Sequence, residues 1–179
     1  MNSNGDRFSN EAQGYSEQAA PVLCQPGGVA WTVFDARIAS IARQFEDFRQ
    51  AEAAGIVLAA PTLAALAAQM HVPKAALEVS ATRPDPDPFG RNYGTTPPLA
   101  PPYRAVRVTG ALFHTQGGLA VGPNAAVLDP AGAAFPNLFA AGGAACGVSG
   151  QQASGYLSGN GLLSAVVLGW LAGQAAARA

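Results

Sequence analysis

The chain has 179 residues, of which 49% are hydrophobic and 12% are charged, so it can bury a substantial core as one large domain or two small ones. Its net charge of −1 and its lack of a basic run argue against nucleic acid as a partner. The two cysteines, Cys24 and Cys146, indicate reduced thiols in a cytoplasmic setting, and two histidines are too few for a His-rich metal site.

The small share of charged residues is itself informative. An isolated domain of this size normally carries more charge on its surface, so part of this surface is expected to be covered by another surface. The stretch 157–177 carries no charge and is the one candidate for a membrane span. Because it is rich in Gly, Ala and Ser and contains Asn160 and Gln174, we interpret it instead as a helix buried in a protein core, and we expect no membrane span.

The first part of the chain is predicted to be mostly helical, with short strands between the helices. The opening segment 2–10 is predicted to be extended, with a turn at Asn4-Gly5-Asp6. Asp35 is placed to cap a long amphipathic helix, which Gly55 ends. The expected helices are 17–24, 36–53, 62–69 and 74–82, and the expected strands are 29–34 and 56–59.

The density of prolines from Arg83 to Pro102 forbids regular structure, and it predicts a long ordered loop or a crossing between domains. After Pro102 the pattern is typical of strands, and it ends in a Gly-rich loop and one long helix. We therefore place a domain boundary near residue 101, between domains 1–101 and 102–179. The expected elements are a strand over 103–113, a hairpin of 119–121 with 126–128, a turn at 129–132, a strand over 137–141, a loop over 142–161 and a helix from about Leu162.

The last part of this pattern points to a cofactor. A strand, a stretch of glycine backbone and then a helix N-terminus is how proteins bring main-chain N–H groups against an anionic or polar cofactor. Glycine is needed because a Cβ atom blocks close approach and forbids some of the required φ/ψ angles. The sequence contains none of three other common site motifs, the P-loop, HExxH and CxxC.

Three motifs together carry a resemblance to a known family. They are PNLFAAGGAACGVSG with GYLSGNGLLSAVVLGWLAG in the last third, His114-Thr115-Gln116-Gly117-Gly118 before it, and Asn4-Gly5-Asp6-Arg7-Phe8-Ser9-Asn10-Glu11 at the start. In this order they resemble FAD-dependent oxidoreductases of the fumarate reductase and succinate dehydrogenase flavoprotein superfamily. The resemblance covers nearly the whole chain and implies FAD as the cofactor.

The resemblance also implies a fold of the α+β or α/β class. Residues 1–101 resemble part of a mostly helical substrate-capping domain, and residues 102–179 resemble the C-terminal strands and long helix of a Rossmann-like FAD domain. The family's N-terminal βαβ unit, with its GxGxxG turn, has no counterpart here. The expected partners are therefore a small-molecule substrate and either a missing N-terminal FAD-binding half or further copies of the chain.

The resemblance implies four catalytic residues. His114 matches the family's substrate-side histidine, whereas Tyr15 and Tyr156 stand where fumarate reductases carry the proton-donating and substrate-clamping arginines. Tyrosines at these places resemble the flavin-dependent 3-ketosteroid dehydrogenases, and Ser158 near Tyr156 suits a hydroxyl relay. The alternatives are a structural histidine in a turn and tyrosines that each make a single hydrogen bond at the edge of a core.

The resemblance also implies the residues that contact the flavin. At Gly143 the family usually has a glutamate for the ribityl chain, so only backbone contacts remain there. The N-terminus of the last helix is expected to stabilise negative charge on the reduced flavin. The expected cofactor-binding residues are Gly117, Gly118, Gly142, Gly143, Gly159, Asn160, Gly161 and Leu162.

Two functional hypotheses follow. In the first, the chain is part of an enzyme in which FAD exchanges hydride with a carbon–carbon bond next to a carbonyl or carboxylate, and a tyrosine exchanges the proton; a tricarballylate dehydrogenase-like relative fits here because His114 is retained. In the second, the chain is a truncated remnant or an accessory chain that does not bind FAD alone. Whether the chain is an enzyme by itself stays open between these hypotheses.

Overall fold

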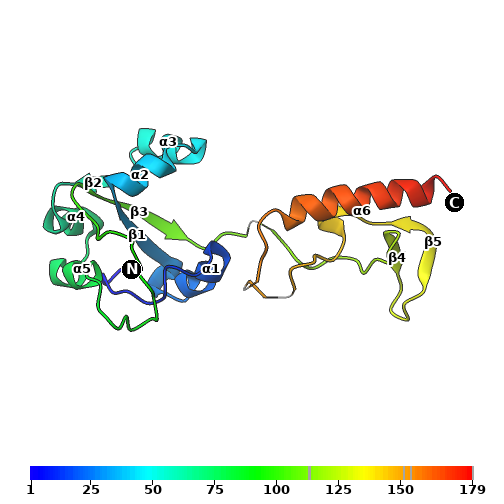
Figure 1. Ribbon diagram of the computed structural model, residues 1–179, viewed down its shortest axis with the longest axis horizontal. Coiled ribbons are helices and arrows are strands. Elements are labelled where there is room, and N and C mark those ends of the chain that lie inside the picture. Colours follow the sequence, from blue (N-terminus) through cyan, green and yellow to red (C-terminus); the bar gives the residue numbers. More distant parts are fainter. Residues whose placement is uncertain (113, 151, 154, 179) are drawn as a thin grey trace. The chain divides into compact units, whose positions relative to one another are not determined.

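The computed structural model describes residues 1–112, 114–150, 152–153 and 155–178. The chain divides into two compact units, Met1–Gly110 and Ala111–Ala179, and each is described by itself (Figure 1). Strand β3 (Tyr103–Thr109) pairs with the strands of the first unit, which therefore extends to Gly110. The division into domains 1–101 and 102–179 stays a prediction.

The first unit is built on an antiparallel sheet in the order β1-β3-β2, with β1 at Val29–Asp35 and β2 at Leu58–Ala60. The register of β1 and β3 runs from Val29 opposite Thr109 to Asp35 opposite Tyr103. The predicted strand 103–113 is too long, because its partner β1 begins opposite Thr109. A Cβ atom at Gly110 would lie 2.7 Å from the Leu23 side chain, so the chain passes close to the preceding helix as it leaves the sheet.

Five helices and one 3-10 turn surround this sheet. Helices α4 and α5 pack together, and α4 contacts β2 and β3 (Figure 1). The buried core they form consists of Ala60, Leu66, Ala67, Met70, Val72, Leu77 and Ala105. The elements are α1 (Tyr15–Leu23), η1 (Pro26–Gly28), α2 (Ala36–Ala42), α3 (Glu46–Ala53), α4 (Leu63–Met70) and α5 (Lys74–Ser80).

The single helix predicted over 36–53 is wrong, because the chain forms α2 and α3 with a break between them. Asp35 caps α2 as expected, accepting a hydrogen bond of 3.0 Å from the main-chain N–H of Ile38. Phe45 is extended, with φ −101° and ψ 136°, and Glu46 and Asp47 then stabilise the N-terminus of a new helix. The side chain of Arg49 donates a 2.9 Å hydrogen bond to the carbonyl of Arg43, which the break leaves free.

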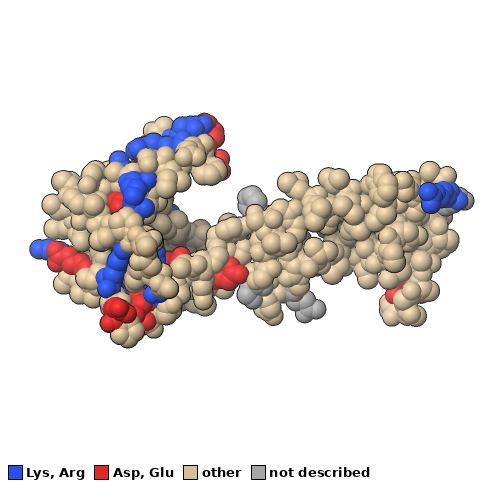
Figure 2. Space-filling view, in the orientation of Figure 1, with Lys and Arg blue, Asp and Glu red and all other residues tan. Residues whose placement is uncertain are grey.

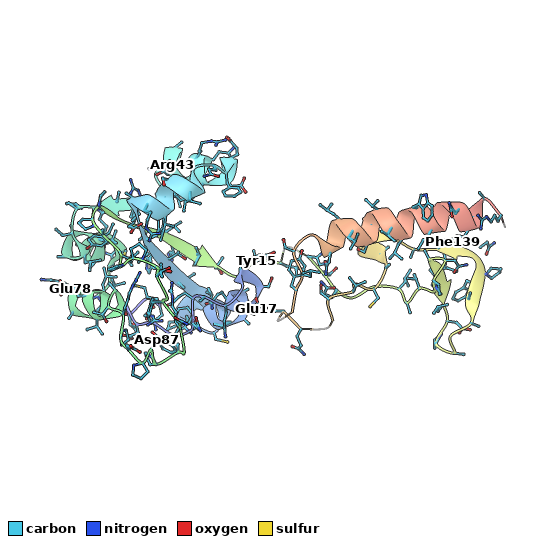
Figure 3. The ribbon with its side chains drawn as sticks, in the orientation of Figure 1. Tyr15, Glu17, Arg43, Glu78, Asp87 and Phe139 are labelled. Atoms are coloured by element: carbon cyan, nitrogen blue, oxygen red, sulfur yellow. The ribbon has the colours of Figure 1, made fainter. Side chains whose placement is uncertain are left out.

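The proline-rich segment after α5 is an ordered loop without regular structure, as predicted, and an ion-pair network attaches it to the N-terminal segment. Arg7 donates to Glu11 at 2.7 Å and to Asp87 at 2.5 Å, and Arg91 donates to Glu11 at 2.9 Å. Asp87, labelled in Figure 3, has a side chain with no exposed surface, and it also accepts from the Tyr93 hydroxyl at 3.0 Å. The hydrogen bond from Arg7 holds the pKa of Asp87 well below its usual value.

The second unit has a small core of short side chains. Its strands β4 (Ala126–Leu128) and β5 (Ala134–Phe139) pair antiparallel, and helix α6 packs on η2 and β5 (Figure 1). The expected hairpin of 119–121 with 126–128 is reduced to one bridge between Val121 and Val127, because β4 pairs mainly with β5. The remaining elements are η2 (Gly142–Ala144) and α6 (Asn160–Ala176), and the buried core is Val127, Ala140 and Ala145.

The two units differ sharply in charge. After Gly110 the sequence contains only Asp129 and Arg178 as charged residues, and Figure 2 shows how few charged side chains the second unit carries. Its helix α6 exposes a row of large apolar side chains, with Leu162 77% and Trp170 62% exposed. Within the described residues, no helix combines the length and the apolar character that a bilayer crossing requires.

The ion-pair network predicts an acid-sensitive first unit. Burial opposes ionisation of Glu11, but hydrogen bonds from Arg7 and Arg91 outweigh it, so the pKa values of both Glu11 and Asp87 lie below their usual range. Their stabilisation is complete above the unfolded pKa values of about 4 and is lost as the pH falls below them. We expect the melting temperature to fall progressively below about pH 5.

Asp87→Asn is expected to lower the melting temperature at pH 7 and to flatten its dependence on pH in the acid range. Thermal melts followed by circular dichroism between pH 7 and pH 3 measure both effects. Glu46→Gln is the matched control, because the Glu46 side chain is 60% exposed and pairs only with Arg49 and its own helix. A wild-type melting curve for Asp87→Asn at pH 7 would contradict the assignment.

Candidate cofactor and substrate site

His114 lies against the first turn of α6 in the second unit. A Cβ atom at Gly161 would lie 3.0 Å from Cε1 and 3.3 Å from Nδ1 of His114, so glycine is what lets the helix backbone rest on the imidazole. The ring of Tyr156 is 5.8 Å from that of His114, centroid to centroid, at an interplanar angle of 55°. The structure therefore brings together His114, Tyr156 and Gly161, three of the residues selected from the sequence.

Buried polar atoms gather in the same unit without hydrogen-bond partners. Among the described residues, none pairs with Nε2 of His114, with either amide atom of Asn160 or with either amide atom of Gln116. Asn160 is 3% exposed. A buried donor or acceptor without a partner costs about 1–3 kcal/mol, so such a group normally has a ligand, a water molecule or another chain to bind.

The N-terminus of α6 is open to a ligand. Gly159 precedes the helix with φ 87°, and no side chain caps it. Within the described part of the chain, the N–H groups of Gly161 and Leu162 have no partner, whereas the N–H of Leu163 bonds to the carbonyl of Gly159 at 3.0 Å. Free N–H groups at the positive end of a 17-residue helix favour an anionic or polar group.

Two of the other predicted glycines permit close backbone approach. At Gly118 a Cβ atom would overlap the main chain of Ala145 and Cys146, beside the bridge between Leu119 and Ala145. Gly142 has φ 56° and lies against Ala165 of α6. Gly117 and Gly143 have no atom within 4 Å of a built Cβ among the described residues, so nothing there requires glycine within this chain.

The remaining predicted residues lie on the surface. Leu162 and Ser158 are exposed in the second unit. Tyr15 begins α1 in the first unit and is 69% exposed (Figure 3). The catalytic roles of Tyr15, His114, Tyr156 and Ser158 stay predictions.

The sequence analysis missed Gln116 and Gly147. A Cβ atom at Gly147 would overlap the amide oxygen of Gln116, and the N–H of Gly147 donates to the Gln116 carbonyl at 2.9 Å. The signal available in the sequence was weak. Gln116 lies between His114 and Gly117, which the resemblance gives as site residues, but nothing in the sequence pairs Gln116 with Gly147.

Comparison with known proteins identifies the family. The FAD binding domain family matches residues 1–162. The chain belongs to the FAD-binding domain family. It belongs to the flavoprotein superfamily that includes fumarate reductases and dehydrogenases, and FAD is the cofactor that this membership implies.

The relatives that this chain matches are much longer than the chain itself. It is 32% identical over 186 residues to the probable fumarate reductase Ifc3 of Shewanella frigidimarina, covering 99% of this chain and 30% of the relative. A flavocytochrome c3 fumarate reductase in an open conformation superposes with TM-score 0.70 at 28% identity, covering 99% of this chain and 32% of that one.

A second solved structure comes from the dehydrogenases. The 3-ketosteroid Δ1-dehydrogenase of Sterolibacterium denitrificans, in complex with 1,4-androstadiene-3,17-dione, superposes with TM-score 0.67 at 25% identity. That match covers 100% of this chain and 38% of the dehydrogenase. The chain thus spans about a third of the length of the proteins it matches.

The residues of this FAD-binding domain fit an isoalloxazine edge at the start of α6. Such an edge presents carbonyl oxygens and an N–H group, and the open N–H groups of Gly161 and Leu162 and the unpaired amide of Asn160 complement both kinds of group. Gly142 and Gly161 serve packing within the unit itself, because a Cβ atom at either would meet Ala165 or His114.

The contact between Gly161 and His114 can be tested directly. Gly→Ala inside a helix normally stabilises by about 1 kcal/mol, and we expect Gly169→Ala to do so because nothing lies within 4 Å of its Cβ position among the described residues. Gly161→Ala is expected to lose this gain and to shift the imidazole of His114. Thermal melts and the His114 ring resonances in NMR measure both effects; equal stabilisation with an unmoved His114 signal would count against the contact.

Proposed function

We propose that this chain forms the flavin- and substrate-facing C-terminal part of an FAD-dependent oxidoreductase. The reaction is a hydride exchange between FAD and a carbon–carbon bond next to a carbonyl or carboxylate. Residues 1–101 serve as part of the substrate-capping domain and residues 102–179 as the C-terminal segment of the FAD domain. The observation that carries this proposal is the unpaired, buried amide of Asn160 at the open N-terminus of α6, beside the unpaired Nε2 of His114.

FAD, when bound, supplies the hydride exchange, and the residues of this chain supply orientation and proton transfer. The N–H groups at the start of α6 would hold the pyrimidine edge of the flavin and stabilise negative charge there. The Nε2 atom of His114 binds the carbonyl or carboxylate oxygen of the substrate and so polarises the bond that reacts. The phenol of Tyr156, whose ring is 5.8 Å from that of His114, transfers the proton, with Tyr15 of the first unit as the second candidate.

The tyrosines support a dehydrogenase-like substrate. Two arginines form a strong clamp for a dicarboxylate, because each offers a bidentate contact and a fixed charge. A phenol offers neither, but it donates or accepts a proton. The similarity to a 3-ketosteroid Δ1-dehydrogenase over the whole chain agrees with this exchange of arginine for tyrosine.

The exposed face of α6 supports a missing partner surface. Leu162, Leu163, Val166 and Trp170 are each more than half exposed, and the helix has no charged residue. Burying such a face contributes about 25 cal/mol per Å² of apolar surface. We propose that an N-terminal FAD-binding half covers it, because this chain spans only 30% of its Shewanella relative.

The primary test is flavin retention. The purified chain, incubated with FAD and passed through gel filtration, is expected to keep a flavin absorbance band when the N-terminal half of the Shewanella relative is co-expressed. Asn160→Leu is expected to lose that band, because it removes the buried amide, whereas Gln44→Leu, at an exposed position of the first unit, keeps it. No band with wild-type chain and partner half would favour the non-catalytic alternative.

The proton-transfer role has a separate test. In the completed enzyme, Tyr156→Phe is expected to lower the rate of substrate dehydrogenation about 100-fold or more while flavin retention stays the same, because only the hydroxyl is lost. Tyr103→Phe is the matched control, since Tyr103 packs beside the core of the first unit. A wild-type rate for Tyr156→Phe would remove Tyr156 from the mechanism and leave Tyr15 as the candidate.

A further inference from the structure

Strand β1 is an edge strand of the sheet in the first unit, and Met1 pairs with its outer side. The strand order β1-β3-β2 leaves that side of β1 without a neighbouring strand. There the amine of Met1 donates to the carbonyl of Trp31 at 2.9 Å, and the N–H of Trp31 donates to the carbonyl of Met1 at 2.7 Å (Figure 1). Two residues that exchange both hydrogen bonds form an antiparallel pair. Met1 therefore lies on β1 as the last residue of an antiparallel strand does.

The outer edge of β1 stays open beyond Trp31. In an antiparallel ladder the N–H and C=O groups of alternate residues face the same side, so those of Val33 face outward as those of Trp31 do. Among the described residues, no main-chain group bonds to Val33 from that side. Thr32 is exposed and Val33 is half-buried, so this part of the strand is open to solvent. By the register of the Met1 pair, the second residue before Met1 would lie opposite Val33.

The chemistry at Met1 favours a peptide group over a free amine. The Met1 side chain packs against the core of the first unit, and burial lowers the pKa of its amine because it disfavours the charged form. A peptide N–H makes the same hydrogen bond to Trp31 without a charge to desolvate. Open strand edges are places at which an extended segment adds to a sheet. The Shewanella relative, of which this chain covers 30%, has further chain that could supply such a segment.

We propose that the open edge of β1 binds an extended segment of the N-terminal FAD-binding half, which leads into Met1 and pairs antiparallel with Val33. The segment's residue opposite Val33 donates its N–H to the Val33 carbonyl and accepts from the Val33 N–H. Because opposite residues place their side chains on the same face and Val33 packs against the core, that residue is apolar. This inference rests on the proposed function, because it says where the proposed half meets the first unit.

The test adds three residues, Thr-Val-Thr, directly before Met1 of the full chain, so that the added valine lies opposite Val33. Amide hydrogen exchange measured by NMR is expected to be about tenfold slower at Val33 than in the unextended chain, as one added hydrogen bond predicts. The Phe34 amide, which faces β3, serves as the internal reference and is expected to stay unchanged. The matched control adds Thr-Pro-Thr, because proline has no N–H to donate to Val33, and it is expected to leave Val33 unprotected.

Equal exchange rates at Val33 in the two extended chains would overturn the proposal. Slow exchange at Val33 in the unextended chain would overturn it as well. A rate that depends on protein concentration would then show a second copy on the edge, and a rate that does not would show that the chain covers the edge itself. Flavin takes no part in this assay, so its failure leaves the flavin-retention test of the proposed function standing, and a failed retention test leaves the result at Val33 standing.

Discussion

The contact between the Gly161 backbone and the imidazole of His114 fixes how the first turn of α6 lies against that ring. Because no Cβ atom intervenes, the first turn of α6 rests on the ring. The unpaired Asn160 amide in that turn therefore lies in the same part of the unit as the unpaired Nε2 of His114. Gly147 does the same for Gln116. Glycine costs conformational entropy at these positions, but its lack of a Cβ atom allows the backbone to lie close to these side chains.

The two units reach stability by different means. The first has a conventional core around Leu66 and Leu77, and an ion-pair network that ties the proline-rich loop to the N-terminal segment. The second has a core of three small buried residues, several unpaired polar atoms and an apolar helix face that lies open. An exposed apolar face and unpaired polar atoms destabilise a protein in water, and regions that bind ligands or partners commonly have them. The second unit therefore combines the unpaired polar atoms and the exposed apolar surface that the proposed function uses.

Much of the fold could be predicted from periodicity and punctuation. Asp35 as a cap, Thr62 as the start of α4, the turn at Gly132 and the long last helix all follow from local chemistry, and all are present. The break at Phe45 could not be predicted, since Ile41, Phe45 and Phe48 keep helical spacing through it. The hydrogen bond from Arg49 to the Arg43 carbonyl, which helps to stabilise the break, is not visible in that spacing. The end of β3 at Thr109 depends on where β1 starts, which is a tertiary fact. In the site, the glycines and His114 carry a motif, but the pairing of Gln116 with Gly147 exists only in three dimensions.

The proposed exchange of arginine for tyrosine and the scarcity of charge in the second unit have the same consequence for the substrate. An anion moved into a dry site without a cation loses several kcal/mol of hydration that hydrogen bonds alone do not recover. A neutral carbonyl loses far less, and in the proposed function the imidazole of His114 and the phenol of Tyr156 replace its bonds to water. These groups also stabilise charge that develops only in the transition state. A more polarised oxygen forms stronger hydrogen bonds with preformed donors than the ground-state oxygen does. The proposed site, built from neutral donors on glycine-defined backbone, therefore predicts catalysis on a neutral substrate rather than tight binding of an anionic one.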